Sequence, residues 1–141
     1  MPKTLVTTLL WSSLFAASAA FSQNASIPGL TPGARYVALG SSFAAGPGIP
    51  DQLGSCGRSD HNYSHLVASA LGLTLTDASC SGATTDHILN TAQGDEGLQI
   101  DAISPDTALV TVTIGGNDIS FTSSTFACSG TSADKHCTAN L

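Results

Sequence analysis

The sequence predicts an α/β fold built on a parallel sheet. Three apolar segments with strand character alternate with segments of helical character, in the order strand, helix, strand, helix, strand. Each predicted strand runs directly into a turn that contains glycine. Parallel strands joined by right-handed helical connections place such turns at one edge of the sheet, where ligands gather.

The three predicted strands differ in their side-chain patterns. Residues 36–39 form a continuous apolar run ending at Gly40, which is typical of a strand buried on both faces. Residues 73–78 alternate apolar with polar side chains and then meet a turn of small residues. Residues 108–114 are dense in β-branched side chains and run into the sequence Gly-Gly-Asn-Asp. The Gly- and Pro-rich stretch 40–50 predicts a loop after the first strand.

Helices are predicted between these strands. Residues 62–71 carry apolar side chains at helical spacing, with Asn62 as the N-cap and Gly72 as the C-terminal stop. Residues 84–90 start a second helix, and residues 98–103 end a helix before a Ser-Pro-Asp breaker. These two connections complete the strand and helix order of a parallel sheet.

Composition excludes several classes of function. The 141 residues have room for one domain, because typical domains hold about 100–150 residues. Hydrophobic residues make up 42% of the chain, which is too apolar for a disordered protein. Four Lys and Arg against ten Asp and Glu give a formal charge of -6. This balance lacks the basic surface that nucleic acid requires, so we expect no nucleic acid partner.

The amino terminus has the layout of a secretory signal peptide. Lys3 precedes the apolar run 5–20, and the small residues of 17–22 follow. The alternative is a signal anchor, but the run is shorter than the roughly 20 residues that a bilayer requires. We therefore expect residues 1–22 to be cleaved, residues 23–34 to form a leader, residues 35–141 to form the domain, and the mature protein to be extracellular without a stable membrane anchor.

The cysteines agree with export. Their even number suits an oxidising compartment, where disulfides persist. Three pairings are possible, and proximity in sequence favours Cys56 with Cys80 and Cys128 with Cys137. A zinc site is the alternative, but the chain has no Cys-x-x-Cys and places His136 beside Cys137. We expect two disulfides, no metal and no cofactor.

Polar groups suited to acyl transfer follow all three predicted strands. Ser41 and Ser42 follow the first strand, Gly82 the second and Asn117 the third. Acyl transfer requires a hydroxyl nucleophile and preorganised donors for the oxyanion about 3 Å from the same carbon. Each turn sequence alone is ordinary, whereas their joint placement at three strand ends predicts a hydrolytic site.

The motifs around these residues resemble those of the SGNH hydrolases, also called GDSL lipases and esterases. Residues 36–43 resemble the family's first motif, residues 80–85 its glycine motif, and residues 115–118 its asparagine motif. Residues 56–59 are similar to the secreted, disulfide-containing branch. The likeness covers about residues 35–128, in the family's order.

This resemblance implies a fold, a reaction and a set of site residues. The implied fold is a flavodoxin-like three-layer α/β/α sandwich, and the implied reaction is hydrolysis of carboxylic esters. Ser42 would be the nucleophile. The backbone N–H groups of Ser42 and Gly82 and the side-chain amide of Asn117 would form the oxyanion hole.

The sequence departs from the family pattern in two ways. Ser41 stands where the first motif usually has Asp. The family's base is a His in a late Asp-x-x-His motif, and no histidine here has Asp three residues before it. The four histidines in question are His61, His65, His87 and His136. We therefore expect an amino-terminal portion of the fold, truncated after the third strand, without the catalytic His and inactive alone.

Two function classes follow. The first is a secreted ester hydrolase, a monomer acting on a lipid or an acylated carbohydrate, of which this chain is a part. The second is a non-catalytic secreted module that binds glycans or lipids, or an inactive remnant. Continuation of the coding region into Asp-x-x-His would distinguish them.

The signal-like segment generates the first testable prediction. The exported form should start between Ala19 and Asn24 and should absorb weakly at 280 nm, because cleavage removes Trp11, the only tryptophan. The intact mass of the secreted protein measures the cleavage site. A mature product that retains Trp11 would contradict the prediction.

Overall fold

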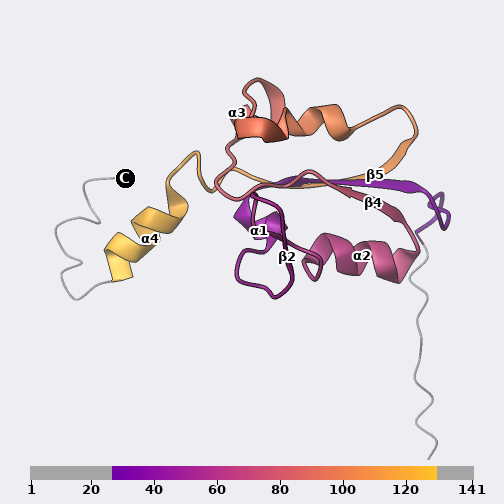
Figure 1. Cartoon of the computed structure of the whole chain (residues 1–141), viewed down its shortest axis with the longest axis horizontal. Coiled ribbons are helices and arrows are strands. Elements are labelled where there is room, and N and C mark those ends of the chain that lie inside the picture. The colour runs from indigo at the N-terminus through magenta and orange to yellow at the C-terminus, as the bar shows by residue number, and fades with distance from the viewer. Residues whose placement is uncertain (1–26, 130–141) are drawn as a thin grey trace, which may run out of the picture.

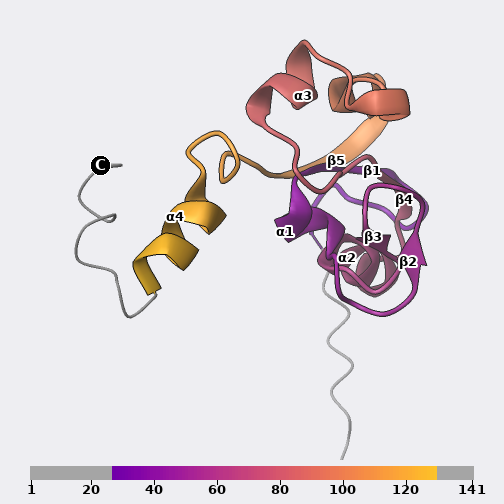
Figure 2. The same ribbon diagram turned by 60° about the vertical axis from the view of Figure 1, so that its left-hand side comes forward.

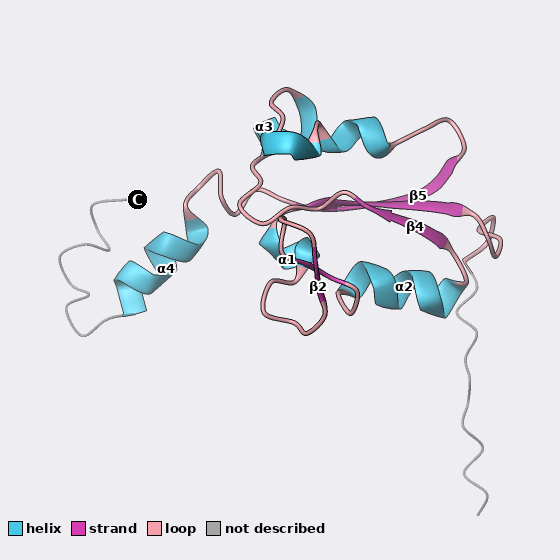
Figure 3. Ribbon diagram, viewed as in Figure 1, coloured by secondary structure: helices cyan, strands magenta, loops and turns pink. Residues whose placement is uncertain are grey.

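A three-stranded parallel sheet forms the centre of the protein. The computed structural model describes residues 27–129. Strand β1 (Arg35–Gly40) lies between β4 (Thr74–Asp77) and β5 (Thr107–Thr113), and both pairings are parallel. Figure 3 shows these strands side by side between helices. The parallel α/β fold predicted from the sequence is therefore confirmed.

Helices cover both faces of the sheet. Helices α1 (Ser42–Ala45) and α2 (Tyr63–Leu71) lie on one face. Helix α3 (Thr85–Leu89) and the two 3₁₀ turns η1 (Gly94–Glu96) and η2 (Gln99–Ala102) lie on the other (Figure 1). This arrangement is a three-layer sandwich, as the family resemblance implied.

Some elements were not predicted. The expected loop 40–50 contains the short helix α1, in which the Ser41 carbonyl accepts the N–H groups of Ala44 and Ala45. The expected helix at 98–103 is instead the 3₁₀ turn η2. Strands β2 (Gln52–Leu53) and β3 (Arg58–Ser59) pair as an antiparallel hairpin.

Helix α4 (Phe121–Ser129) follows β5 and projects away from the sheet (Figures 1 and 2). Residues 115–120 connect it to the end of β5. Across residues 27–129, no helix has the length and apolar character needed to cross a bilayer.

The core is divided between the two faces of β1. Tyr36 and Ala38 pack toward α2, and Val37 and Leu39 pack against Ile88 of α3. All four β1 side chains are at most 1% exposed, which confirms the predicted burial of this strand on both faces. Burying a side chain of the size of valine or leucine contributes about 1.5–3 kcal/mol, so β1 anchors both layers.

Strand β5 is less covered than β1. Val110 and Val112 pair with Val37 and Leu39 and share their face of the sheet, yet they are 39% and 52% exposed. Helix α3 and η2 thus cover the central strand and leave apolar side chains of the edge strand in contact with solvent.

The turn at Gly40 generates the second prediction. Gly40 has φ +146°, and a Cβ there would lie 2.4 Å from the Thr113 carbonyl oxygen and 2.9 Å from the Ala44 Cβ. Gly40→Ala should lower the free energy of unfolding by about 3 kcal/mol or more, through backbone strain and overpacking together. Urea unfolding of both proteins measures the difference.

Gly48 provides the matched control. It also has a positive φ, +88°, but no atom lies within 4 Å of a Cβ there. Gly48→Ala should therefore cost only the backbone strain, about 1–2 kcal/mol. Equal losses for the two variants would show that the close contact with Thr113 does not constrain the turn.

Candidate active site

The end of β1 is joined to the ends of both neighbouring strands. The Ser41 N–H donates to the Thr113 carbonyl of β5 at 2.9 Å, and the Cys80 N–H donates to the Gly40 carbonyl at 2.9 Å. Cys80 follows β4 by three residues. Because these bonds continue the strand pairing into the turns, the three turns start from fixed positions.

The turns after β4 and β5 are joined to each other by side chains. The Asn117 Nδ2 donates to the Ala83 carbonyl at 2.7 Å. The Asp118 carboxylate accepts from the Thr85 N–H at 3.0 Å and the Thr85 hydroxyl at 2.5 Å. The Thr85 hydroxyl bond holds the pKa of Asp118 below its ordinary value. Each pair of the three turns is therefore connected directly.

Three hydrogen-bond donors remain open on these turns. The Ser42 N–H is the first in α1 and has no partner among the described residues. The Gly82 N–H also has no partner there, and Gly82 has φ +82°, which favours glycine. The second Nδ2 hydrogen of Asn117 is likewise uncommitted. Within this part of the chain the Ser42 hydroxyl accepts and donates no hydrogen bond.

A disulfide fixes the turn that contains Gly82. Cys56 and Cys80 are bonded, with their Cα atoms 4.5 Å apart, and are 2% and 5% exposed. The Ser81 N–H also donates to the Cys56 carbonyl at 2.9 Å. The bond ties the loop between β2 and β3 to the Gly82 turn, and it is the pairing that sequence proximity favoured. The expected partner pair, Cys128 with Cys137, lies outside the described residues.

A buried polar cluster connects α1 to β4 and α2. The Asn62 Nδ2 donates to the Ala45 carbonyl of α1 at 3.1 Å and to the Asp77 carboxylate of β4 at 2.7 Å. The Asn62 Oδ1 accepts the N–H groups of Ser64 and His65, which confirms the predicted N-cap of α2. The link from β4 through Asn62 to α1 was not predicted, because spacing in the sequence does not reveal it.

The described histidines are engaged elsewhere or exposed. The His87 Nδ1 accepts the Thr84 N–H at 3.0 Å in a capping box, so this nitrogen is not available as a base. His61 is exposed beside Asp60, and His65 is partly buried on α2. His136 lies outside the described residues. In the described part of the chain, no hydrogen bond joins a histidine to Ser42.

One surface cluster carries groups of the kind that bind metals. Asp51, Asp60 and His61 place one potential ligand atom each within 4.8 Å of one another. All three side chains are exposed. The turns after β1, β4 and β5 contribute no residue to this cluster.

The sequence profile of the GDSL-like Lipase/Acylhydrolase family matches residues 38–136, which include all three turns. The chain belongs to this family. The match agrees with the resemblance carried by the first, glycine and asparagine motifs.

Relatives from Streptomyces support the family assignment. Lipase 2 of Streptomyces coelicolor is 44% identical over 92 residues, covering 62% of this chain and 31% of the relative. The lipase of Streptomyces rimosus is 37% identical over 97 residues, covering 66% and 34%. Lipase 1 of Streptomyces coelicolor is 34% identical over 125 residues, covering 84% and 44%. The chain thus spans less than half the length of these GDSL-like relatives.

Two crystal structures share the fold. The extracellular lipase from Streptomyces rimosus has a TM-score of 0.61 at 36% identity, covering 75% of this chain and 44% of that one. Phospholipase A1 from Streptomyces albidoflavus NA297 has a TM-score of 0.60 at 33% identity, covering 77% and 44%. The sequence relatives and the structural neighbours thus both include lipases of Streptomyces.

The contact between Asp118 and Thr85 generates the third prediction. The pKa of Asp118 is lowered in the folded state, so the contact is intact above the unfolded value of about 3.9 and is lost as the pH falls through the folded value. In an acid titration followed by NMR, the Thr85 amide proton should move upfield with a midpoint below about 3.9.

Asp118→Asn should abolish this titration of the Thr85 amide, whereas Asp101→Asn, at an exposed position of η2, should leave it unchanged. A midpoint at or above the ordinary value would show that the Thr85 hydroxyl does not stabilise the ionised carboxylate.

Proposed function

We propose that this chain provides the nucleophile and the oxyanion hole of a secreted carboxylic ester hydrolase. The Ser42 Oγ attacks the carbonyl carbon of the ester, and a tetrahedral intermediate forms. Its negatively charged oxygen accepts hydrogen bonds from the Ser42 N–H, the Gly82 N–H and the Asn117 Nδ2. Collapse expels the alcohol and leaves an acyl-enzyme, which water then hydrolyses.

One observation carries this proposal: the three open donors lie on turns that are hydrogen-bonded to each other pairwise. The Asn117 amide is held at 2.7 Å from Ala83, the residue after Gly82. Donors fixed before the substrate arrives require little reorganisation as charge develops, and this preorganisation makes an oxyanion hole effective.

The general base is proposed to come from a segment outside residues 27–129 that carries Asp-x-x-His. The Ser42 hydroxyl proton must leave during attack, and an isolated serine hydroxyl is a weak nucleophile. Among the described histidines, His87 uses its Nδ1 in the capping box. We therefore propose that the present chain is an amino-terminal portion of the enzyme and hydrolyses esters poorly alone.

The substrate class and location are proposed from the relatives. Those compared are named as lipases or a phospholipase A1, and one is described as extracellular. Together with the signal-like residues 1–22, this supports an exported enzyme, with residues 35–141 as part of its domain, acting on esters of lipids or acylated carbohydrates.

Adding a carboxy-terminal extension with Asp-x-x-His provides the test. The extended form should hydrolyse a short-chain aryl ester faster than the 141-residue chain, and Ser42→Ala should abolish the gain. Asn117→Ala in the extended form should reduce turnover by about 10²–10³-fold, the loss expected for one oxyanion donor. Initial rates of aryl alcohol release measure these effects.

Asn90→Ala is the matched control, because the Asn90 side chain bonds only Asp86 on the exposed surface of α3. It should retain the rate of the extended form. An extended form that binds lipid or glycan but never forms an acyl-enzyme would favour the non-catalytic binding module instead. Equal, Ser42-dependent turnover by the short and extended forms would show that a histidine of this chain is the base.

A further inference from the structure

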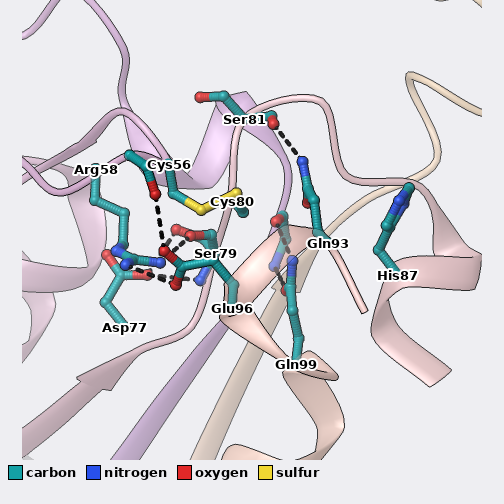
Figure 4. Close-up of a disulfide and its surroundings, with 12 residues drawn as sticks. Cys56, Arg58, Asp77, Ser79, Cys80, Ser81, His87, Gln93, Glu96 and Gln99 are labelled. Atoms are coloured by element: carbon teal, nitrogen blue, oxygen red, sulfur yellow. Dashed lines mark hydrogen bonds and ion pairs between the residues drawn. A yellow bond between two sulfur atoms is a disulfide. The ribbon is translucent and has the colours of Figure 1, made fainter. Parts of the chain in front are cut away.

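A buried glutamine bonds both backbone groups of Gly40, the last residue of β1. Gln99, on η2, is 4% exposed. Its Oε1 accepts the Gly40 N–H at 2.7 Å, and its Nε2 donates to the Gly40 carbonyl at 3.0 Å. One carboxamide thus satisfies both backbone groups of a residue 59 positions away, at the point where β1 ends (Figure 4).

The position of this contact matters because Gly40 lies two residues before Ser42. The Gly40 carbonyl also accepts the Cys80 N–H, so this carbonyl is bonded from two sides. The Gly40 φ of +146° lies in a region that is open to glycine but rarely adopted by other residues. Because glycine has many accessible conformations, these hydrogen bonds select the one that sets the direction in which the chain leaves β1, and hence the position of α1.

The surroundings of Gln99 show why a polar side chain is placed there. Residues on the same face form an apolar cluster around Val37, Leu39 and Ile88. An apolar side chain at position 99 would leave the buried Gly40 N–H without an acceptor, which costs about 1–3 kcal/mol. The carboxamide does not titrate, so it supports the turn without supplying a proton.

The segment that contains Gln99 also contacts the turn of Gly82, the second proposed oxyanion donor. The Gln93 Nε2 donates to the Ser81 carbonyl at 2.8 Å, next to Gly82. Glu96 pairs with Arg58 at 3.0 Å, and Arg58 donates to the Ser79 carbonyl. Residues 93–99 therefore contact the turns after both β1 and β4, and Figure 4 shows Gln93 beside Ser81.

We propose that Gln99 is a positioning residue for ester hydrolysis, which sets the Ser42 Oγ and N–H through its paired hydrogen bonds to Gly40. This rests on the proposed function of Ser42. Gln99 does not contact the reacting atoms, and its effect passes through the backbone. A displacement of about 1 Å at a reacting group can cost about 100-fold in rate, so a loosened Gly40 peptide changes the reactivity of Ser42.

The test measures phosphonylation of Ser42 by an alkyl fluorophosphonate in the extended form that carries Asp-x-x-His, which is the parent for the variants below. In this reaction the Oγ–P bond forms, the P–F bond breaks, fluoride leaves and the hydroxyl proton passes to the base. Peptide mass spectrometry locates the adduct. Gln99→Met removes both hydrogen bonds at similar volume and should slow labelling at least tenfold, within the roughly 100-fold that misplacement can cost.

Gln99→Glu provides a readout that a purely structural role would not change. The ionised carboxylate keeps the acceptor for the Gly40 N–H but places an oxygen against the Gly40 carbonyl. The protonated carboxyl restores the donor. Burial raises its pKa above the ordinary value of about 4.3, so the labelling rate relative to the parent chain at equal pH should recover as the pH falls through this raised value.

Gln52→Glu is the matched control. The exposed Gln52 side chain also donates to two backbone carbonyls, those of Gly46 and Ile49, but does not contact Gly40. Its labelling rate should equal that of the parent at every pH. If Gln99→Met fails to fold, the pH-dependent recovery of Gln99→Glu still decides the question.

The possible failures are distinguishable. Parent-rate labelling of Gln99→Met, or a rate ratio for Gln99→Glu that does not change with pH, would overturn the positioning role alone. Absence of labelling at Ser42 in the extended parent, with its Asp-x-x-His segment present, would overturn the proposed function and the positioning role with it. Slow exchange of the Gly40 amide proton in the parent, accelerated in Gln99→Met, would report the contact independently of Ser42.

Discussion

The backbone N–H and carbonyl of Gly40 are the groups on which the other parts of this candidate site depend. Gly40 ends the central strand, and its carbonyl accepts hydrogen bonds from Cys80 of the next turn and from Gln99. The space beside it is filled by the Thr113 carbonyl, which a Cβ would approach to 2.4 Å. Packing therefore excludes a side chain here, and hydrogen bonding determines the direction in which the chain continues into α1.

The supports of the site come from both faces of the sheet. On the α2 face, Asn62 connects the last residue of α1 to Asp77 of β4. On the α3 face, Gln99 and Gln93 contact the turns after β1 and β4. Side chains from both faces of the sheet therefore hold α1 and the turns after β1 and β4.

Sequence patterns revealed the parts of the molecule that depend on local periodicity. The buried run of β1 and the Asn62 cap have local signatures, and the turns bearing Ser42, Gly82 and Asn117 were located because they follow strands. Two-residue strands such as β2 and β3 have no measurable period. The contact of Gln99 with Gly40 joins residues 59 positions apart, and a glutamine in a 3₁₀ turn resembles any surface residue in sequence.

This architecture separates the proposed oxyanion donors from the group that would accept the serine proton. The hydrogen bonds that join the three turns to one another lie within residues 40–118, and the turn after β5 is also bonded to the start of α4, where the Phe121 N–H donates to the Gly116 carbonyl at 2.8 Å. The Ser42 hydroxyl remains without a partner in the described structure. In the proposed function, a base from outside residues 27–129 accepts the proton of this hydroxyl, while the proposed oxyanion donors are already held by the joined turns. Preorganised donors require little rearrangement as charge develops, so the proposed oxyanion hole does not depend on where the base comes from.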